Sequence, residues 1–358
     1  MGAVYSSKKT TMWLAIYDWI QRVPFIVNLA RTLFGSRFVN NSIFYERFTL
    51  FLARRYNQKR PLGSRRLNIE TTLACNSKCS FCSKQSFPLQ VGTMKQDLFE
   101  KIIREAVSLN VRHVILSVYG EPLSDAQFLE RAGFVDHRGI DFSFYTNGSL
   151  LTKSVGQSLL SFKRLREIYF SVNAFRKETY EDIMRGLDRD RVYENISQFA
   201  SLKNSLRPDI HAIVTCVLYE KNQKEKDALF NYFNKTKGID FVYFYALRNR
   251  AGTPLDWQLE NQHYDLSPLA QRGRKLLPCK YLWEDLFIYW NGDVGVCCED
   301  SAARRIVIGN LERQSLLEIW VGEEMTAIRQ AHIQRKRKSL RVCGQSCTYN
   351  TIWLKPKT

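Results

Sequence analysis

The chain has 358 residues, of which 45% are hydrophobic, and its formal net charge is +18. This composition describes a soluble, folded protein with room for one large domain and a smaller one. Nine cysteines in this length are too few for a secreted disulfide scaffold, and no secretory signal is visible. We therefore expect the cysteines to act as ligands in a reducing cytoplasm.

The first 65 residues form a basic segment rich in aromatic and aliphatic side chains. Residues 1–66 contain twelve Lys or Arg residues and two acidic residues, Asp18 and Glu46. Charges interrupt every apolar run before the roughly 18–20 residues that a membrane-spanning helix needs. We predict a basic amphipathic helical extension over 1–65. Two interpretations stay open, namely association with a membrane surface and packing on the rest of the protein or on another subunit.

From residue 66 onward, short apolar runs alternate with helical patterns. The expected strands are 66–71, 111–118, 140–146, 167–173, 210–219 and 239–247, and the expected helices are 98–109, 151–162, 177–186, 192–203 and 223–234. Strands separated by crossover helices predict a parallel sheet. The fold class is therefore α/β, a partial (β/α)6 TIM-like barrel over residues 66–255, with its chemistry at the carboxyl ends of the strands.

The periodicity stops near 250–278, where several Gly and Pro residues occur, and a smaller domain is predicted over 256–358. It opens with a hairpin of strands 286–290 and 294–298, because Asn-Gly between apolar runs is a strong turn signal. A helix is expected over 316–328. The basic run 335–338 is expected to solvate a helix end.

Cys75, Cys79 and Cys82 are separated by three and then two residues. Three thiolates can hold three irons of a [4Fe–4S] cubane and leave the fourth iron open, whereas structural metal sites normally close their coordination shell. A zinc site is the alternative, but no fourth Cys or His follows within the next dozen residues. The spacing thus favours a cluster that can bind a further ligand.

This stretch, including Phe81 before the third cysteine, resembles the cluster motif of radical S-adenosylmethionine (SAM) enzymes. The resemblance implies reductive cleavage of SAM to a 5′-deoxyadenosyl radical and hydrogen abstraction from a substrate carbon. It also implies an electron donor such as flavodoxin or ferredoxin. Cofactor-binding roles then fall on residues near successive strand ends: Phe81, Gly120, Glu121, Asn147, Ser171, Asn173 and Arg185.

The second cysteine group resembles the SPASM/twitch type of C-terminal extension, with Gly292 between the first two cysteines at the spacing of that family. Its candidate ligands are Cys279, Cys297, Cys298, Cys343 and Cys347. Five cysteines suit one auxiliary [4Fe–4S] cluster, with zinc as the alternative. The glycine spacing favours Cys297 over Cys298, and Cys216 is interpreted as a buried structural residue.

The resemblance leaves the substrate open among a peptide, a sugar and a lipid-linked glycan. The aromatic, basic extension favours a membrane-associated or lipid-linked substrate. The protein is expected to be cytoplasmic and to associate peripherally with the inner face of the membrane. The alternatives from other classes are an RNA-modifying enzyme and a non-catalytic iron–sulfur binding protein. A nucleic-acid partner is disfavoured, because no RNA-binding module is recognised and half of the charge excess lies in the amphipathic segment.

Overall fold

The structure is a computed structural model that describes residues 50, 53, 66–247, 278–340 and 342–343. The N-terminal extension, the segment 248–277 and Cys347 lie outside the described residues, and so do the expectations placed on them. In the described part of the chain, no helix is long and apolar enough to cross a membrane.

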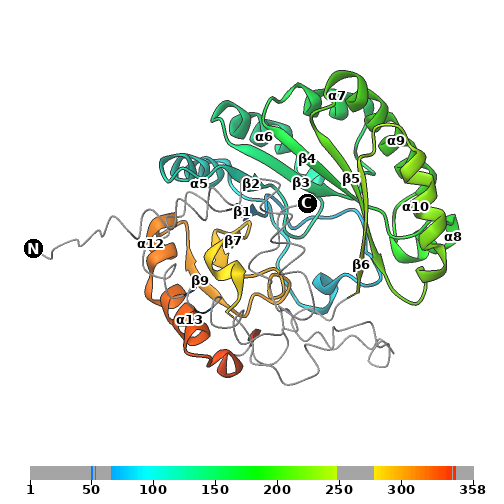
Figure 1. Ribbon diagram of the computed structural model, residues 1–358. Helices are drawn as coiled ribbons and strands as arrows, with labels where there is room; N and C mark the ends of the chain where they lie inside the picture. Colours follow the sequence, from blue (N-terminus) through cyan, green and yellow to red (C-terminus); the bar gives the residue numbers. More distant parts are fainter. Residues whose placement is uncertain (1–49, 51–52, 54–65, 248–277, 341, 344–358) are drawn as a thin grey trace, which may run out of the picture.

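Six strands and their crossover helices form the first part of the fold (Figure 1). In chain order they are β1 (Arg66–Ile69), α5 (Gln96–Ser108), β2 (His113–Ile115), α6 (Phe128–His137), β3 (Asp141–Thr146), α7 (Lys153–Ser161), β4 (Leu165–Ser171), α8 (Lys177–Ile183), α9 (Arg189–Leu206), β5 (His211–Leu218), α10 (Lys226–Lys235) and β6 (Phe241–Ala246). All neighbouring strands pair in parallel from β1 to β6. The predicted partial barrel is confirmed, and α6 is an additional helix that was not predicted from the sequence.

Short 3-10 turns complete the connections between these elements. They are η2 (Ser83–Ser86), η3 (Pro122–Ser124), η4 (Gln223–Glu225), η7 (Lys280–Trp283) and η8 (Arg337–Ser339).

The C-terminal part extends the same sheet. Strand β7 (Asp285–Ile288) pairs in parallel with β1, and β8 (Asp293–Gly295) and β9 (Val307–Asn310) follow in antiparallel fashion. The sheet therefore has nine strands in the order β6-β5-β4-β3-β2-β1-β7-β8-β9. The predicted hairpin is present, with Gly292 in the left-handed region at φ 84°.

The expected helix over 316–328 is two helices, α12 (Leu316–Val321) and α13 (Glu323–Ile333). They meet at Gly322, whose backbone is extended at ψ 164°. A Cβ at this position would lie 2.8 Å from the carbonyl oxygen of Glu318, so only glycine fits the break. Apolar periodicity continues across the break because both helices bury the same kind of face, and this is why the sequence predicted one helix.

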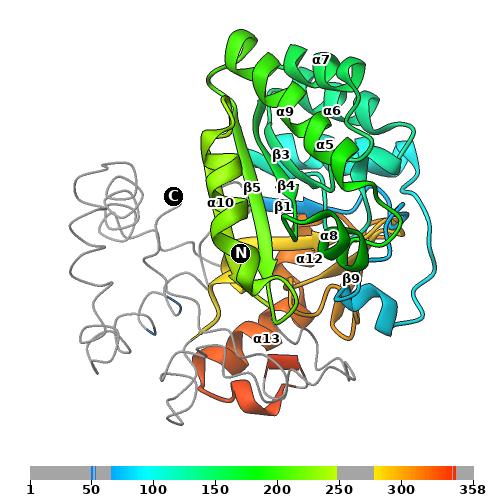
Figure 2. The ribbon, with the colours of Figure 1, turned by 90° about the vertical axis from the view of Figure 1, so that its right-hand side faces the viewer.

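The helices cover one face of the curved sheet and leave an inner face opposite them (Figures 1 and 2). Phe144 packs its ring against Phe128 of α6, and Phe170 packs against Phe199 of α9. Side chains alternate along a strand, so the residues next to these phenylalanines point to the inner face. Apolar burial on the outer face thus fixes which polar and aromatic side chains line the inside of the barrel.

Candidate functional site

The three cysteines of the first group lie on the loop after β1, at the carboxyl end of the parallel strands. Cys75, Cys79 and Cys82 are all half-buried. Burial raises the pKa of the Cys79 thiol to about 12, and repulsion from the other two thiolates adds to this shift. Thiolates in such a place need strong positive charge beside them, which the irons of a cluster supply. The donor set therefore fits an iron–sulfur cluster.

The cysteine loop is anchored on the last residue of α8 and on the segment after it. The amide of Lys78 donates to the carbonyl of Arg185 at 2.9 Å, and the amide of Ser80 donates to the carbonyl of Ile183 at 2.8 Å. The hydroxyl of Ser77 also donates to the Arg185 carbonyl, at 3.1 Å, and lies 3.2 Å from the sulfur of Cys79. Backbone hydrogen bonds thus hold the loop, and they do not occupy its thiol groups.

Gly120 and Glu121 connect the cysteine loop to the end of β3. Gly120 has φ 84°, and a Cβ there would lie 2.4 Å from the carbonyl oxygen of Thr72. The Glu121 amide donates to the Ala74 carbonyl at 2.8 Å. The Glu121 carboxylate is buried. It accepts hydrogen bonds from the Thr146 hydroxyl at 2.7 Å and from the backbone amide of Asn147 at 2.6 Å. Glu121 therefore has a positioning role at the junction of three strand ends.

Asn147 completes this junction. Its side-chain amide donates to the Asn76 side-chain oxygen at 2.9 Å, and Asn76 in turn donates to the Ser149 hydroxyl at 2.8 Å. Asn76 directly follows the first cysteine, so the end of β3 and the cysteine loop are joined side chain to side chain. Asn76 and Ser77 were missed by sequence reasoning, although polar residues inside a ligand loop are a usable signal.

The two polar residues at the end of β4 have different surroundings. Ser171 is half-buried and pairs in register with Thr215 of β5. Asn173 is 4% exposed, and its side-chain oxygen accepts from the Val217 amide at 2.8 Å. The Asn173 amide group contacts the sulfur of Met184, which also lies 3.4 Å from the Cys79 sulfur. The side chain of Asn173 is thus hydrogen-bonded inside the protein, close to the cysteine loop.

The remaining sequence candidates lie at the surface of the loop. The Arg185 side chain is 57% exposed and forms an ion pair with Asp182 at 3.7 Å. Phe81 packs edge-on against the ring of Tyr219, with centroids 5.7 Å apart, and the Tyr219 hydroxyl lies 3.1 Å from that of Ser80. Tyr219 is a further contact that the spacing of motifs did not indicate.

The second cysteine group encloses a small pocket. Its lining includes Cys279, Cys297 and Cys343, which are 7%, 9% and 7% exposed, together with apolar side chains and Arg337. Cys298 is not part of this lining, and its sulfur lies 3.9 Å from a carboxylate oxygen of Glu299. Three buried thiols facing one pocket fit the auxiliary cluster, and Cys347 falls outside the described residues.

Arg337 corrects the expectation that the whole basic run 335–338 is solvated. Its neighbours in the run are exposed, but Arg337 is 1% exposed and faces the cysteine pocket. Nearby, Nδ1 of His332 accepts a hydrogen bond from the backbone amide of Cys279 at 3.1 Å. Burial, and then the charge of Arg337, lower the pKa of His332 to about 3, so this imidazole is neutral. A buried cation beside the thiols offsets the negative charge that a thiolate-bound cluster carries.

A buried ion pair joins the two cysteine sites. Glu70, at the end of β1, accepts from Arg304 at 2.6 Å, and the two side chains are 0% and 9% exposed. The Arg304 guanidinium also lies over the ring of Tyr289, 4.1 Å from its centroid. Burial raises the pKa of Glu70 to about 7, and Arg304 opposes that shift. The end of β1, which leads into the first cysteine loop, is thereby connected to the loop after Cys298.

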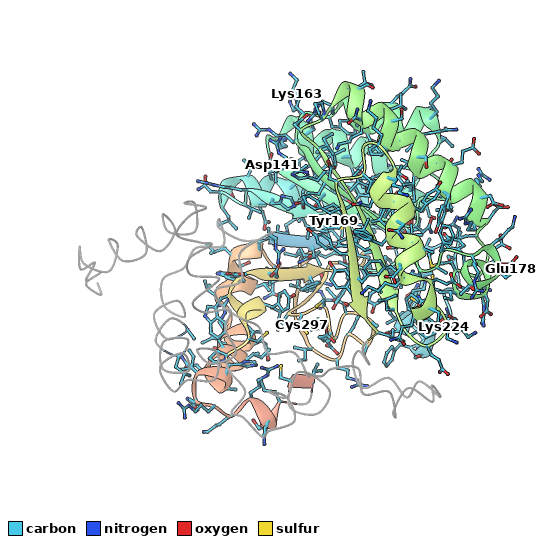
Figure 3. All side chains as sticks on the ribbon, turned by 45° about the vertical axis from the view of Figure 1, so that its right-hand side comes forward. Asp141, Lys163, Tyr169, Glu178, Lys224 and Cys297 are labelled. Atoms are coloured by element: carbon cyan, nitrogen blue, oxygen red, sulfur yellow. The ribbon has the colours of Figure 1, made fainter. Side chains whose placement is uncertain are left out.

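Within the described residues, no three His, Cys, Asp or Glu side chains are arranged as ligands of a single metal ion. The thiolates of a cubane each bind a different iron, so they do not converge on one atom. Figure 3 shows Cys297 near the C-terminal strands, and Tyr169 within the arch of β3, β4 and β5.

Two family models match this chain. The Radical SAM superfamily model matches residues 69–230, and the SPASM iron–sulfur cluster-binding domain model matches residues 279–348. The matches cover both cysteine groups.

A curated relative is the tungsten-containing aldehyde ferredoxin oxidoreductase cofactor-modifying protein of Pyrococcus furiosus. It is 23% identical over 298 residues, which are 74% of this chain and 82% of the relative. Among solved structures, Streptococcus suis SuiB bound to its precursor peptide SuiA has a TM-score of 0.61 at 17% identity, covering 84% of this chain and 75% of SuiB. BtrN in complex with AdoMet and 2-DOIA has a TM-score of 0.53 at 18% identity, covering 80% and 94%. At these identities the two structures show the shared fold.

Proposed function

Because the chain belongs to the radical SAM superfamily and continues into a SPASM-type iron–sulfur domain, we propose that it abstracts a hydrogen atom from a carbon of its substrate. The chain is an enzyme whose cofactors are a [4Fe–4S] cluster, SAM and an auxiliary iron–sulfur cluster. The observation that carries the proposal is the loop of three half-buried thiols, tied by Glu121 and Asn147 into the carboxyl ends of the barrel strands.

Cys75, Cys79 and Cys82 would hold the first cluster, and their loop would present it to the inside of the barrel. When bound and reduced, the cluster would supply the one electron that reductive cleavage of SAM needs. The protein contributes position and protection. Its Ser77 hydroxyl donates to the Arg185 carbonyl and lies 3.2 Å from the Cys79 sulfur, so it would turn its single proton to the sulfur to donate to a thiolate.

The residues at successive strand ends would bind SAM. Gly120 lets the backbone approach closely, and its neighbour Glu121 keeps Asn147 in place. Ser171 has a hydroxyl group at the end of β4 that could bind SAM. Asn173 accepts a hydrogen bond from Val217 and so keeps the end of β5 next to β4. Arg185 is exposed enough to turn from Asp182 to the carboxylate of a bound cofactor, which is a role for its side chain beyond the loop anchoring by its carbonyl.

Cys279, Cys297 and Cys343, together with Cys347, would hold the auxiliary cluster. Their pocket is apolar apart from Arg337 and Glu299, so it excludes water from the thiolates. A site of this kind can accept an electron from the reaction or anchor the substrate.

For the substrate we retain a peptide, a sugar or a lipid-linked glycan. The relatives act on or bind different classes of molecule, since one modifies a protein cofactor and another is seen with a peptide. We also propose a flavodoxin or ferredoxin as electron donor, and contact of the basic segment 1–65 with a membrane surface. The net charge of the segment supports this last proposal.

The test uses full-length protein reconstituted with iron and sulfide under anaerobic conditions. Wild-type protein given SAM and dithionite is expected to release 5′-deoxyadenosine. The Cys79→Ala variant is expected to lose this product and about four irons per chain. Cys216→Ala is the matched control, because Cys216 is a buried cysteine of β5 outside both ligand groups. Product formation by Cys79→Ala would contradict the proposal.

A further inference from the structure

The inner face of the barrel carries aromatic side chains on neighbouring strands. Tyr145 of β3 and Tyr169 of β4 are partners in the strand register. Their rings stack with centroids 4.3 Å apart and an interplanar angle of 14°. Phe170, the next residue, packs on Phe199 of α9, so Tyr169 points to the opposite, inner face of the sheet. The two rings cover one face of each other, so the aromatic surface that the pair offers inside the barrel consists of its outer ring faces and its edges.

Strand β6 extends this surface. Phe244 lies below the ammonium group of Lys226 of α10, so it points to the outer face. Its neighbours Tyr243 and Tyr245 consequently point inward. Phe241 stacks on Tyr243 with centroids 5.8 Å apart, and the buried Ile213 of β5 is the register partner of both Tyr169 and Phe241. Aromatic side chains of β3, β4 and β6 thus share the inner face, with Ile213 of β5 between those of β4 and β6.

Much of this aromatic surface is accessible. Tyr145, Phe241 and Tyr245 are 39%, 43% and 48% exposed. Exposed aromatic surface is costly in water, and contiguous patches usually mark binding sites. A ligand that covers these rings would recover this cost.

Glu167 gives the surface its charge preference. It lies two residues before Tyr169 on the same strand face, and it accepts the hydroxyl of Tyr169 at 2.9 Å. Among the residues that the structure describes, no salt bridge to Glu167 is formed. A carboxylate accepts hydrogen bonds from hydroxyl and amine groups and repels phosphate. The site therefore favours neutral or cationic ligands over phosphorylated ones.

The surface lies directly below the reaction site proposed above. Tyr145 immediately precedes Thr146 and Asn147, which Glu121 and Asn76 tie to the cysteine loop. A ring placed on Tyr145 would lie within the barrel, beneath the cluster loop. Ser171 is a register partner of Thr215 on the same face and adds a half-buried hydroxyl group at its rim, whereas the buried Thr215 hydroxyl donates to the Phe170 carbonyl at 3.2 Å.

We propose that Tyr145, Tyr169 and Tyr245, with Glu167, form a subsite that stacks a hydroxylated ring of the substrate, and that this ring is a neutral sugar or an amino sugar. The C–H face of such a ring covers aromatic surface, while its hydroxyl and amine groups are donors for the carboxylate. An amine adds attraction to the tyrosine faces. This inference rests on the proposed function, because it assigns the substrate class of the same barrel.

The experiment measures binding of glucose, glucosamine and glucose 6-phosphate to the full-length reconstituted protein by saturation-transfer NMR. We expect transfer to glucose and glucosamine, with glucosamine bound more tightly and glucose 6-phosphate more weakly. Tyr145→Ala should weaken sugar binding about fivefold. Tyr245→Ala is the second variant in case the first does not fold. Glu167→Gln should remove the preference for glucosamine.

The matched control is Phe230→Ala, which removes an aromatic ring of similar exposure, 40%, from the outer surface of α10. It should bind the sugars as the wild type does. The inference is overturned if no sugar receives transfer, if both tyrosine variants bind like the control, or if glucose 6-phosphate binds most tightly. Release of 5′-deoxyadenosine by the wild type is measured in parallel. Its failure would contradict the proposed function, whereas sugar binding tests the subsite by itself.

Discussion

The two cysteine sites are held by different kinds of contact. The first loop is fixed by hydrogen bonds among polar groups, in which Glu121, Asn147 and Asn76 connect three strand ends. The second site is enclosed mainly by apolar side chains, together with one buried cation, Arg337, and one buried carboxylate, Glu299. Polar networks at strand ends keep a site open to a charged ligand, whereas an apolar enclosure keeps water out.

The thiols of the two cysteine sites also differ in how deeply they are buried. The thiols of the first loop are half-buried, and those of Cys279, Cys297 and Cys343 are buried. We interpret the first site as one that exchanges a bound cofactor in each turnover, and the second as one that handles electrons without exchanging ligands. Three predictions test this contrast, beginning with the largest expected effect.

Replacing Cys297 with alanine should remove the auxiliary cluster, while replacing Cys298 should not. Cys297 lines the pocket with two other thiols, and Cys298 contacts Glu299 instead. The expected loss is about four irons per chain in Cys297→Ala, with the cluster of the first loop retained. Iron analysis and Mössbauer spectra of both variants provide the measurement. Equal iron loss in the two variants would refute the assignment.

Replacing Arg304 with methionine should break the connection between the two regions. It leaves the Glu70 carboxylate buried without its partner, and breaking one side of a buried pair costs about 3–5 kcal/mol. Denaturant unfolding measures the loss. The double variant Glu70→Met/Arg304→Met should recover most of it, because neither charge then remains buried.

The control for this pair is Lys177→Met, since Lys177 and Asp190 form an exposed ion pair. It should unfold close to the wild type. A double variant as unstable as Arg304→Met alone would show that the loss comes from packing and not from charge.

Glu121 should make the stability of the first region depend on pH. Burial raises its pKa from 4.5 to about 7 in the folded protein. As the pH rises from 4.5 to 7, the unfolded chain releases this proton while the folded protein retains it, so stability falls across this window. The fall attributable to this residue is at most about 3 kcal/mol.

The measurement compares unfolding free energies of the wild type and Glu121→Gln at pH 5.5, 6.5 and 7.5. The variant should be less stable at pH 5.5, because glutamine keeps only one acceptor oxygen for the two donors, the Thr146 hydroxyl and the Asn147 amide, and turns its NH2 group to the other. Its stability should change less with pH than that of the wild type. Parallel pH profiles would contradict the role of the Glu121 proton.

Much of the fold was predictable because its signals are local. The alternation of apolar runs and helical patterns indicated all six parallel strands, and Asn291-Gly292 indicated the hairpin. Helix α6 was missed, and the break at Gly322 was missed because burial on both sides continues the same apolar pattern. The domain boundaries at 65 and 255 and the roles of the SAM-binding residues stay predictions.

The sequence by itself determined the two cysteine groups, since ligand spacing within a loop is a property of the chain alone. The glycine spacing also favoured Cys297 over Cys298, and Cys297 is the one of the two that lines the pocket; its role as a ligand stays a prediction. Only the tertiary structure decided that Arg337 is buried at that pocket, that Glu121 positions other groups, and that tyrosines of separate strands stack. Each of these depends on which distant segments pair and bury one another, and residue spacing along the chain carries no record of such pairings.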